Sequence, residues 1–517
     1  MTTKSPRQWG SKGFIPFRLE VLTPVYIGSG DVLSPLEYVI REKNGKARLY
    51  RIDLQSWLMR YGSEQSVQNI IATGDIARIR RMLDERVDEA VYAVSSSHIA
   101  DLSLAEDLGQ AFEDQQADAS HKTKTGDVDA ALRNPLDKCL YIPGSSLKGA
   151  MSTPLINWLD KFGHTSLKDA SCMDPKRGMQ DRLREMFGPI GEHAMQALKL
   201  SDVAAPLSAC AVVRAKERSL NPEKAGTPKA PCEAIMPDCG NMWGRLMLDS
   251  PEGTPAITLP GGKTIPLAEL VRLCNAFYSK RFTAEMKKFY RLPHFLDVHT
   301  ALCETERKIM GLGPDSMLLR AGHYSHVESV TVDNNQPVTR MVKGKSMPYG
   351  TTRTLADDKL PFGWVILHFC TREEYETGMA EAEAARRAAV AEQTEQFLTL
   401  RRKAEEQTAQ AALLKRQQEE RRLAAEQKAA EEQKKREELE RRMAELSPEE
   451  ARLLKLETCP SEALSMEIFN DMKKWSPELQ HKAAEALRDC WSAMGKWNGK
   501  QSKKQEVKIR EVKALLA

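Results

Sequence analysis

Four short segments place glycine beside serine or threonine, residue types that can bind phosphate. They are YIGSG (26–30), IPGSSLKGA (142–150), LRAGHYSHVES (319–329) and PYGTTRTL (348–355). Glycine allows close backbone approach and positive φ, and free backbone N–H groups bind anionic oxygen. Hydroxyls add donors, and three of the segments carry Lys or Arg. One such segment is usually a plain turn, but four in one body predict a ligand with several phosphates.

The order of residues in these segments excludes two common nucleotide loops. Residues 144–150 lack the GxxxxGK[ST] order of a P-loop. Gly28 and Gly30 are followed by Asp31, Val32 and Leu33, so the GxGxxG pattern of a dinucleotide loop is also absent. Nucleotide hydrolysis and redox chemistry therefore have no support. A single RNA strand held by its backbone fits the segments better, without a cofactor.

Length and charge limit the class of protein. The chain has 517 residues, which predicts more than one domain, and 76 basic against 72 acidic residues give a net charge of only +4. Any basic surface must therefore be local. The sequence has no CxxC pair, no apolar signal core and no apolar run long enough to cross a membrane. We expect a reduced, cytoplasmic, soluble protein.

Alternating strands and helices fill residues 1–375 and predict an α+β body. Strand periodicity occurs in FRLEVLTPVYIG, and WGRLMLD and FGWVILHFC are two more strand candidates. YVIREKNGKARLYRIDL predicts a hairpin at Asn44–Gly45. Helical spacing occurs in DIARIRRMLDERVDEAV and SKRFTAEMKKFYRL. In the second of these, Phe282, Met286 and Phe289 share a face and are expected in the core.

Two helical regions follow this body. Residues 376–446 are rich in strong helix formers and predict a long charged helix or a helical hairpin, with acid–base pairs such as Glu431–Lys435 and Glu432–Arg436. Residues 447–517 predict a small helical domain with a basic tail. Ser447 and Ser476, each followed by proline, are the expected N-caps there.

The quoted segments together resemble a known family. LEVLTPVYIGSGDVLSPLEYVI, YIPGSSLKGA, LLRAGHYSHVESVTV and TTRTL with LPFGWVIL resemble the RAMP proteins of type III CRISPR–Cas effector complexes. They are most similar to the fifth Csm subunit type of type III-A complexes, which caps the filament at the guide's 3′ end. The resemblance covers most of residues 14–370. It implies a modified ferredoxin-like (RRM-like) fold, crRNA and target-RNA partners, and neighbouring RAMP and small subunits.

The resemblance also implies which residues contact RNA. All four segments would contact the guide backbone, the fourth through one threonine and one arginine. The residues are Gly28, Ser29, Gly30, Gly144, Ser145, Ser146, Lys148, Arg320, Gly322, His323, Thr352 and Arg353. Residues 211–236 predict a strand, a basic loop and a strand. In the family a similar hairpin acts as a thumb against the guide–target duplex, and here its basic residues would be Arg214, Lys216, Arg218 and Lys224.

Catalysis has two candidate residues. Backbone RAMP subunits cut RNA with an aspartate in the loop after the first glycine motif, and Glu37 stands at the matching place. His323, beside His326, could act as acid or base in guide processing. A strand cap or ion pair explains Glu37 equally, and stacking on RNA explains His323. Cys232 and Cys239, with Cys210 upstream, lack the close pairing of structural zinc ligands, so we expect no metal.

We therefore expect a non-catalytic RNA-binding subunit of a type III antiviral ribonucleoprotein complex. It would hold the 3′ part of the crRNA by backbone contacts and cap the RAMP filament. Two alternatives remain: a RAMP endoribonuclease that acts on guide precursor or target RNA, and a scaffold that recruits proteins through residues 376–517.

Overall fold

The computed structural model of the chain describes residues 13–110, 126–162, 175–224, 226–248, 255–335, 339–498 and 502–517. They belong to two compact units, Met1–Arg401 and Arg402–Ala517, each described here by itself.

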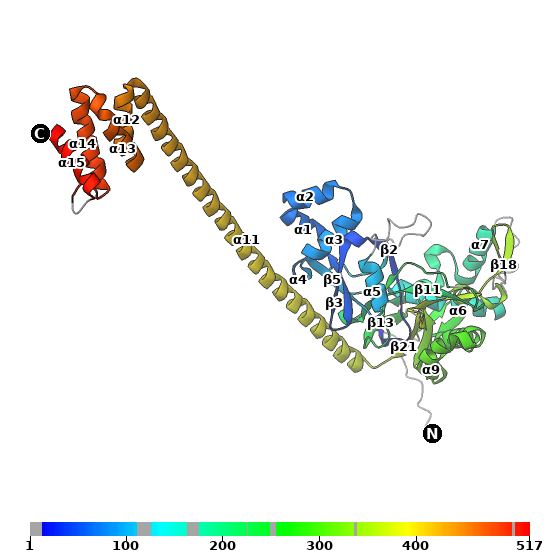
Figure 1. Cartoon of the computed structure of the whole chain (residues 1–517). Helices are drawn as coiled ribbons and strands as arrows, with labels where there is room; N and C mark the ends of the chain where they lie inside the picture. Colours follow the sequence, from blue (N-terminus) through cyan, green and yellow to red (C-terminus); the bar gives the residue numbers. More distant parts are fainter. Residues whose placement is uncertain are drawn as a thin grey trace. The chain divides into compact units, whose positions relative to one another are not determined.

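A five-stranded antiparallel sheet forms the centre of the first unit (Figure 1). Its strand order is β16 (Ser316–Arg320), β21 (Trp364–Phe369), β1 (Ile15–Val21), β13 (Met242–Leu248) and β8 (Leu198–Leu200). In the chain, helix α6 (Gly144–Phe162) lies between β1 and β8, and helix α8 (Leu267–Glu285) lies between β13 and β16. Without the added strand β16, this is the βαββαβ order of a ferredoxin-like fold. The prediction of an α+β, modified ferredoxin-like body is confirmed.

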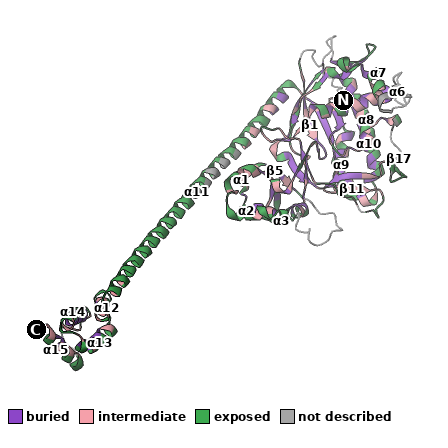
Figure 2. Ribbon diagram, turned by 90° about the horizontal axis from the view of Figure 1, so that it is seen from above, coloured by how far each residue is buried: buried purple, intermediate pink, exposed green. Residues whose placement is uncertain are grey.

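The core lies between this sheet and its two helices. Phe17 and Leu19 of β1 and Trp364 of β21 are fully buried. The predicted strands in the segments that form β1, β13 and β21 are confirmed, and β21 is buried on both faces. Phe282, Met286 and Phe289 are also fully buried, as predicted, although α8 gives way to a π-helical turn at Met286–Tyr290. Figure 2 shows the buried residues gathered on the strands of this body.

A seven-stranded sheet forms a second layer of the first unit. Its order is β2 (Gly28–Leu33), β6 (Val128–Ala131), β12 (Cys232–Ile235), β10 (Cys210–Val213), β5 (Ala93–Ile99), β4 (Lys46–Ile52) and β3 (Tyr38–Lys43). β3 and β4 form the predicted hairpin. Asn44 and Gly45 both have positive φ, 54° and 68°, as the tight hairpin turn requires. β2 is the last strand at one end of this sheet.

Short elements complete the first unit. The helices are α1 (Leu54–Tyr61), α2 (Gln65–Ala72), α3 (Ile76–Arg86), α4 (Glu89–Tyr92), α5 (Leu102–Gly109), α7 (Pro175–Phe187), α9 (Leu296–Met310) and α10 (Val327–Val330). The small sheets pair β7 (Tyr141–Ile142) with β9 (Val203–Ala204), β11 (Ala215–Ser219) with β19 (Thr352–Ala356) and β20 (Leu360–Pro361), β14 (Ala256–Thr258) with β15 (Thr264–Pro266), and β17 (Thr339–Val342) with β18 (Lys345–Pro348).

Helix α11 runs from Arg372 to Glu445 as one continuous helix. The alternative of a helical hairpin is therefore wrong. Figure 2 shows that exposed residues cover most of its length. The predicted pair Glu431–Lys435 forms at 3.0 Å, whereas Arg436 pairs with Glu440 and not with Glu432. Within the described ranges, no helix is both long enough and apolar enough to span a membrane.

Four helices form the end of the second unit: α12 (Pro448–Thr458), α13 (Glu462–Asp471), α14 (Pro477–Ala493) and α15 (Lys503–Leu516). They enclose their own core, in which Leu456, Leu487 and Val512 are fully buried. Ser447 caps α12 in a capping box with Glu450. The small C-terminal helical part is confirmed, and its basic tail folds as α15.

Candidate nucleic-acid interface

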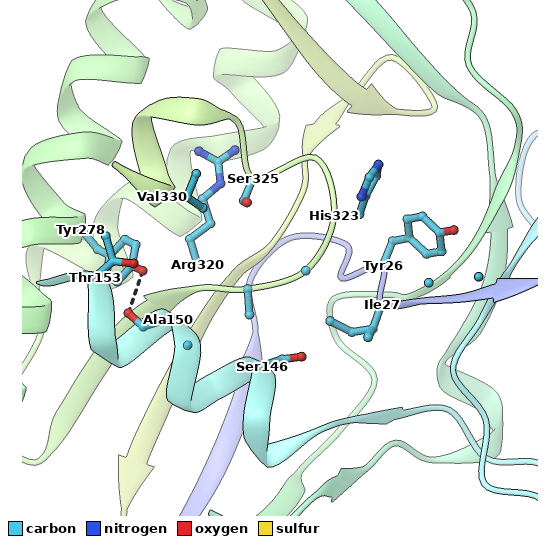
Figure 3. A pocket seen from close by; sticks show the side chains of 15 residues that line it. Tyr26, Ile27, Ser146, Ala150, Thr153, Tyr278, Arg320, His323, Ser325 and Val330 are labelled. Carbon is cyan, nitrogen blue, oxygen red and sulfur yellow. Dashed lines mark hydrogen bonds between the residues drawn. The ribbon is translucent and has the colours of Figure 1, made fainter. Parts of the chain in front are cut away.

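A cleft of about 600 Å³ opens on the first unit where three of the four glycine-rich segments meet (Figure 3). The segments come from the chain before β2, from the start of α6 and from the loop after β16. The lining residues are Tyr26, Ile27, Gly28, Gly30, Ser146, Gly149, Ala150, Thr153, Tyr278, Arg320, Ala321, Gly322, His323, Ser325 and Val330. Segments more than 170 residues apart in the chain therefore share one surface.

The α6 wall of the cleft is a strand-to-helix junction and not a loop. A Cβ atom at Gly144 would collide with the carbonyl oxygen of Leu200, so only glycine fits there. The Gly144 N–H donates to a carboxylate oxygen of Asp202 at 2.9 Å, so this helix terminus already holds an anionic group. One turn later, the helical repeat turns Ser146, Gly149 and Thr153 toward the cleft.

The loop after β16 forms the opposite wall. Gly322 has a φ of +88°, and a Cβ there would lie 2.6 Å from the Tyr26 carbonyl oxygen. The next residue, His323, donates its backbone N–H to the same oxygen at 2.8 Å. The first and third glycine-rich segments are therefore joined through Tyr26. In Figure 3, Ser146, Ala150 and Thr153 lie on the helix, across from the loop that carries His323 and Ser325.

Aromatic rings lie at one end of the cleft. The exposed His323 ring lies 5.7 Å from Tyr26 and 4.3 Å from Tyr324, edge to face in both cases. Burial and the nearby Asp129 carboxylate raise the pKa of the Tyr26 phenol, so it stays a neutral hydrogen-bond donor. Such rings can stack on unpaired bases, and the hydroxyls of the α6 wall can donate to phosphate.

Arg320 and Arg353 form a buried arginine cluster with Glu285 and Glu328, beneath the surface. Arg320 Nη1 lies 2.6 Å from Glu285 and Arg353 Nε lies 2.8 Å from it, while Arg353 also pairs with Glu328 at 3.0 Å. The exposed fraction is 2% for the Arg320 side chain and 4% for the Arg353 side chain. Burial alone would raise the pKa of Glu285, but the two guanidinium groups lower it to about 2.

This burial corrects the expectation that both arginines contact phosphate. Arg320 lines the floor of the cleft, but its guanidinium is bound to Glu285, Ser329 and the carbonyl oxygen of Phe362. Arg353 and its neighbour Thr352 lie in β19, outside the cleft. Arg353 Nη1 donates to the Thr352 carbonyl oxygen at 2.9 Å. The fourth glycine-rich segment thus supports the cleft from within the fold.

The basic residues of the predicted thumb have partners within the fold. The two strands predicted around the loop are present as the paired strands β10 and β12, and between them residues 215–219 form β11, which pairs with β19 along five residues. The basic side chains of the segment are ion-paired: Arg214 with Asp107 at 2.9 Å, Lys216 with Asp358 at 2.5 Å, and Arg218 with Asp297 at 2.9 Å. Lys224 lies at the exposed end of the segment.

Three other predicted RNA ligands lie beside the cleft. Ser29 is in β2, where its hydroxyl donates to the Ala130 carbonyl at 3.2 Å. Ser145 is exposed on α6, one residue before the cleft-lining Ser146. Lys148 is half-buried on a neighbouring face of α6, and burial, together with the nearby Lys199 charge, lowers its pKa. Lys148 therefore adds positive charge near the cleft but not inside it.

The two catalytic candidates have other contacts. Glu37 completes a capping box at the 3₁₀ turn Pro35–Glu37, where it accepts the Ser34 N–H at 2.9 Å. His326, three residues after His323, is half-buried and accepts the Thr354 N–H at 3.1 Å. Burial and the charges of Arg353 and Arg320 lower its pKa to about 3, so His326 stays neutral at physiological pH. Neither arrangement brings an acid and a base together.

The cysteines belong to the sheet. Cys210 and Cys232 are buried on the paired strands β10 and β12, and burial raises the pKa of both thiols. Cys239 follows β12 and is partly buried. Among the described residues, no group of three His, Cys, Asp or Glu side chains is placed to hold a metal ion.

Several cleft residues were not predicted from the sequence. Gly149 and Thr153 lie three and seven residues after Ser146, so helical periodicity from the known motif could have found them. Tyr278 donates its hydroxyl to the Ala150 carbonyl at 2.8 Å and joins α8 to α6 beneath the cleft. It lies in an ordinary amphipathic helix and carries no local signal.

Comparison with known proteins finds one matching family model and a number of similar solved structures, of which two are described here. Residues 18–226 match the family model described as "RAMP superfamily", and no curated protein matches the chain. Similar solved chains occur in a cryo-EM structure of a Csm–crRNA–target RNA ternary complex of a type III-A CRISPR–Cas system (18% identity, 69% of this chain and 100% of that chain covered, TM-score 0.48) and in a crystal structure of T. onnurineus Csm5 (18%, 68% and 99%, TM-score 0.45). The family match includes the first two cleft segments and ends before the third.

Proposed function

We propose that the chain, whose residues 18–226 match the RAMP superfamily model, is an RNA-binding subunit of a type III CRISPR effector complex. It holds the 3′ part of the crRNA in the cleft and caps the RAMP filament, with RAMP backbone subunits and small subunits as neighbours. The observation that carries the proposal is the meeting of three glycine-rich segments, distant in the chain, on one cleft.

The chemistry of the cleft favours backbone recognition. Its polar groups are hydroxyls and a histidine ring, which can reach phosphate and 2′-OH groups of any sequence. The exposed His323 ring offers a face for stacking, and stacking tolerates every base. Of the described residues that line the cleft, only Arg320 carries a permanent charge, and Glu285 neutralises it. Binding within the cleft therefore depends mainly on hydrogen bonds and stacking.

The experiment is a binding titration of the full chain with guide RNAs of equal length and unrelated spacers. We expect affinities within about threefold of one another, because each contact is to the backbone. The variant Ser146→Ala with His323→Ala should weaken all guides by about tenfold, by analogy with the value of stacking and hydrogen bonds. The control is Ser145→Ala on the same helix turn, which should bind as the parent does.

Two outcomes would overturn the proposal. A strong preference for one spacer sequence would show base readout and not backbone recognition. Equal loss of binding in the Ser145 control and in the Ser146–His323 variant would show that the cleft is not the RNA site.

The proposed subunit is not catalytic. Glu37 is committed to a helix cap, and the surroundings of His326 keep it neutral, so neither supports an acid–base pair with His323. Incubation with guide precursor or target RNA, with and without divalent metal, should leave the RNA intact. Cleavage that disappears in Glu37→Ala or His323→Ala would establish the endoribonuclease alternative.

A further inference from the structure

A second pocket lies at the other end of β2 from the cleft. Its volume is about 260 Å³, and its lining includes Leu33, Arg51, Ser95, Arg133 and Lys138. Gly28 and Gly30 of β2 line the cleft, whereas Leu33, the last residue of the same strand, lines the second pocket. At about 3.3 Å per residue, Gly30 and Leu33 are on the order of 10 Å apart.

The second pocket has a surplus of positive charge. The Arg51 guanidinium makes no hydrogen bond or ion pair with side chains of the described part of the chain, although its charge helps to lower the pKa of the nearby Glu233. Lys138 donates to the Pro135 carbonyl at 2.8 Å, which leaves two of its three N–H groups available. Arg133 is 2.6 Å from Glu233, and its Nη1 holds the Lys138 carbonyl at 2.7 Å, so it fixes the shape of the pocket.

A buried hydroxyl also faces this space. Ser95 is 9% exposed and lines the pocket. Its hydroxyl can donate a hydrogen bond to an anionic oxygen there. Arg51 and Ser95 are directly opposed on β4 and β5, so their side chains lie on the same face of the sheet.

The carboxylates around the second pocket have other partners. Glu37 lines it but accepts the Ser34 N–H in the capping box. Glu233 is bound to Arg133, and Asp137 pairs with Arg386 at 3.1 Å. The charge offered to a ligand is therefore that of Arg51 and Lys138, which suits an anion.

We propose that the second pocket binds a phosphate group of the RNA strand whose neighbouring part occupies the cleft. This inference rests on the proposed function. The volume is below that of pockets that enclose drug-sized ligands, so it suits one group of a larger ligand. β2 ends its sheet and leads from the cleft to the pocket, and the pocket supplies the cationic charge that the cleft lacks.

The test compares a short oligouridine that fits within the cleft with a long one that extends beyond it, both fluorescently labelled and mixed with the full chain. Arg51→Gln and Ser95→Ala should weaken the long strand, by about tenfold for Arg51→Gln, and leave the short strand unchanged. The salt slope for the long strand should fall by about 0.7 in Arg51→Gln, as expected when one phosphate contact to a single strand is lost.

Arg48→Gln is the matched control. Arg48 lies on the same strand β4, is exposed and contacts Ser96, so the variant loses the same charge outside the pocket. Its affinity for both strands should equal that of the parent. Uridine monophosphate, titrated by calorimetry, tests the pocket as a site for free nucleotides.

The outcomes separate this inference from the proposed function. If Arg51→Gln and Ser95→Ala bind the long strand as the parent does, while the Ser146–His323 variant loses affinity, the inference falls and the proposed function stands. If neither group of variants changes RNA affinity, both fall. Loss of uridine monophosphate binding in Arg51→Gln without any change for RNA would make the pocket a free-nucleotide site and overturn the RNA assignment.

Discussion

The cleft and the arginine cluster beneath it share the glycine-rich segment that carries Arg320 but differ in chemistry. The cleft presents hydroxyls, glycines and rings to solvent, whereas Arg320 and Arg353 are turned inward onto Glu285. A basic residue next to a phosphate-binding pattern can therefore stabilise the glycine-rich loop from inside the fold without contacting the phosphate. Variants of the cluster should therefore change stability, and variants of the cleft should change RNA affinity.

The largest expected effect is on stability, from Glu285→Gln. Removing the carboxylate leaves two buried guanidinium groups uncompensated, which should lower the free energy of unfolding by about 3–5 kcal/mol. Urea unfolding followed by tryptophan fluorescence measures this, since Trp364 lies 4.7 Å from Arg320. The control is Glu269→Gln on the same helix, whose carboxylate pairs with Arg272 near the surface. If Glu285→Gln lost no more unfolding free energy than Glu269→Gln, the arginine cluster would not have the structural role assigned to it.

Acid should remove the same contribution. Glu285 has a folded pKa of about 2 against an ordinary value of 4.5, so the unfolded chain binds the proton first as the pH falls. The contribution, about 3 kcal/mol, is complete above pH 4.5 and is lost as the pH falls toward 2. Stability measured across this window should fall less steeply in Glu285→Gln than in the parent.

The next effect tests the junction between the two regions. Gly322→Ala should destabilise the first unit by about 2 kcal/mol, because alanine is strained at positive φ and its Cβ would press on the Tyr26 carbonyl. RNA affinity should fall with it, since this contact joins two walls of the cleft. Gly313→Ala, at an open position without positive φ, is the control in thermal unfolding. Equal melting temperatures for the two variants would contradict the assignment.

The sequence predicted what depends on neighbours in the chain. The Asn44–Gly45 hairpin, the strands β1 and β21 and the cap at Ser447 each follow from a local pattern. The three cleft segments were also predicted as phosphate-binding in type, because glycine with hydroxyls is a local signal.

Long-range partners decided the rest. The partner of Arg320 and Arg353 is Glu285, 35 and 68 residues earlier in the chain, and nothing near either arginine indicates it. Strand β11 within the predicted thumb was not foreseen for the same reason, since Ala215 pairs with Ala356 across the fold. Lys148 differs again: it stands one position before Gly149, which is enough on a helix to turn it off the cleft.

A smaller effect, on affinity alone, should come from Gly149→Ala. This glycine lines the cleft on α6, and a Cβ there would meet no protein atom within 4 Å. The methyl should stabilise the helix by up to about 1 kcal/mol. It should weaken RNA binding by about tenfold, or about 1.4 kcal/mol, if the RNA backbone packs against the glycine.

Gly109→Ala at the end of α5, also in open space, is the control for the helix effect. Anisotropy titration and thermal unfolding of both variants separate the two quantities. Unchanged affinity in Gly149→Ala would place the RNA away from α6 and remove one wall from the interface.

The smallest effect should come from Lys148→Ala. Lys148 lies beside the cleft and near Lys199, so its charge reaches phosphate only across solvent. We expect affinity to fall by about threefold and the salt slope by less than the 0.7 of a direct phosphate contact. Lys46→Ala, exposed at the start of β4, is the control for general loss of charge. If the salt slope fell by the 0.7 of a direct phosphate contact and affinity fell tenfold, Lys148 would be a direct phosphate ligand. The cleft would then bind RNA by charge as well as by hydrogen bonds.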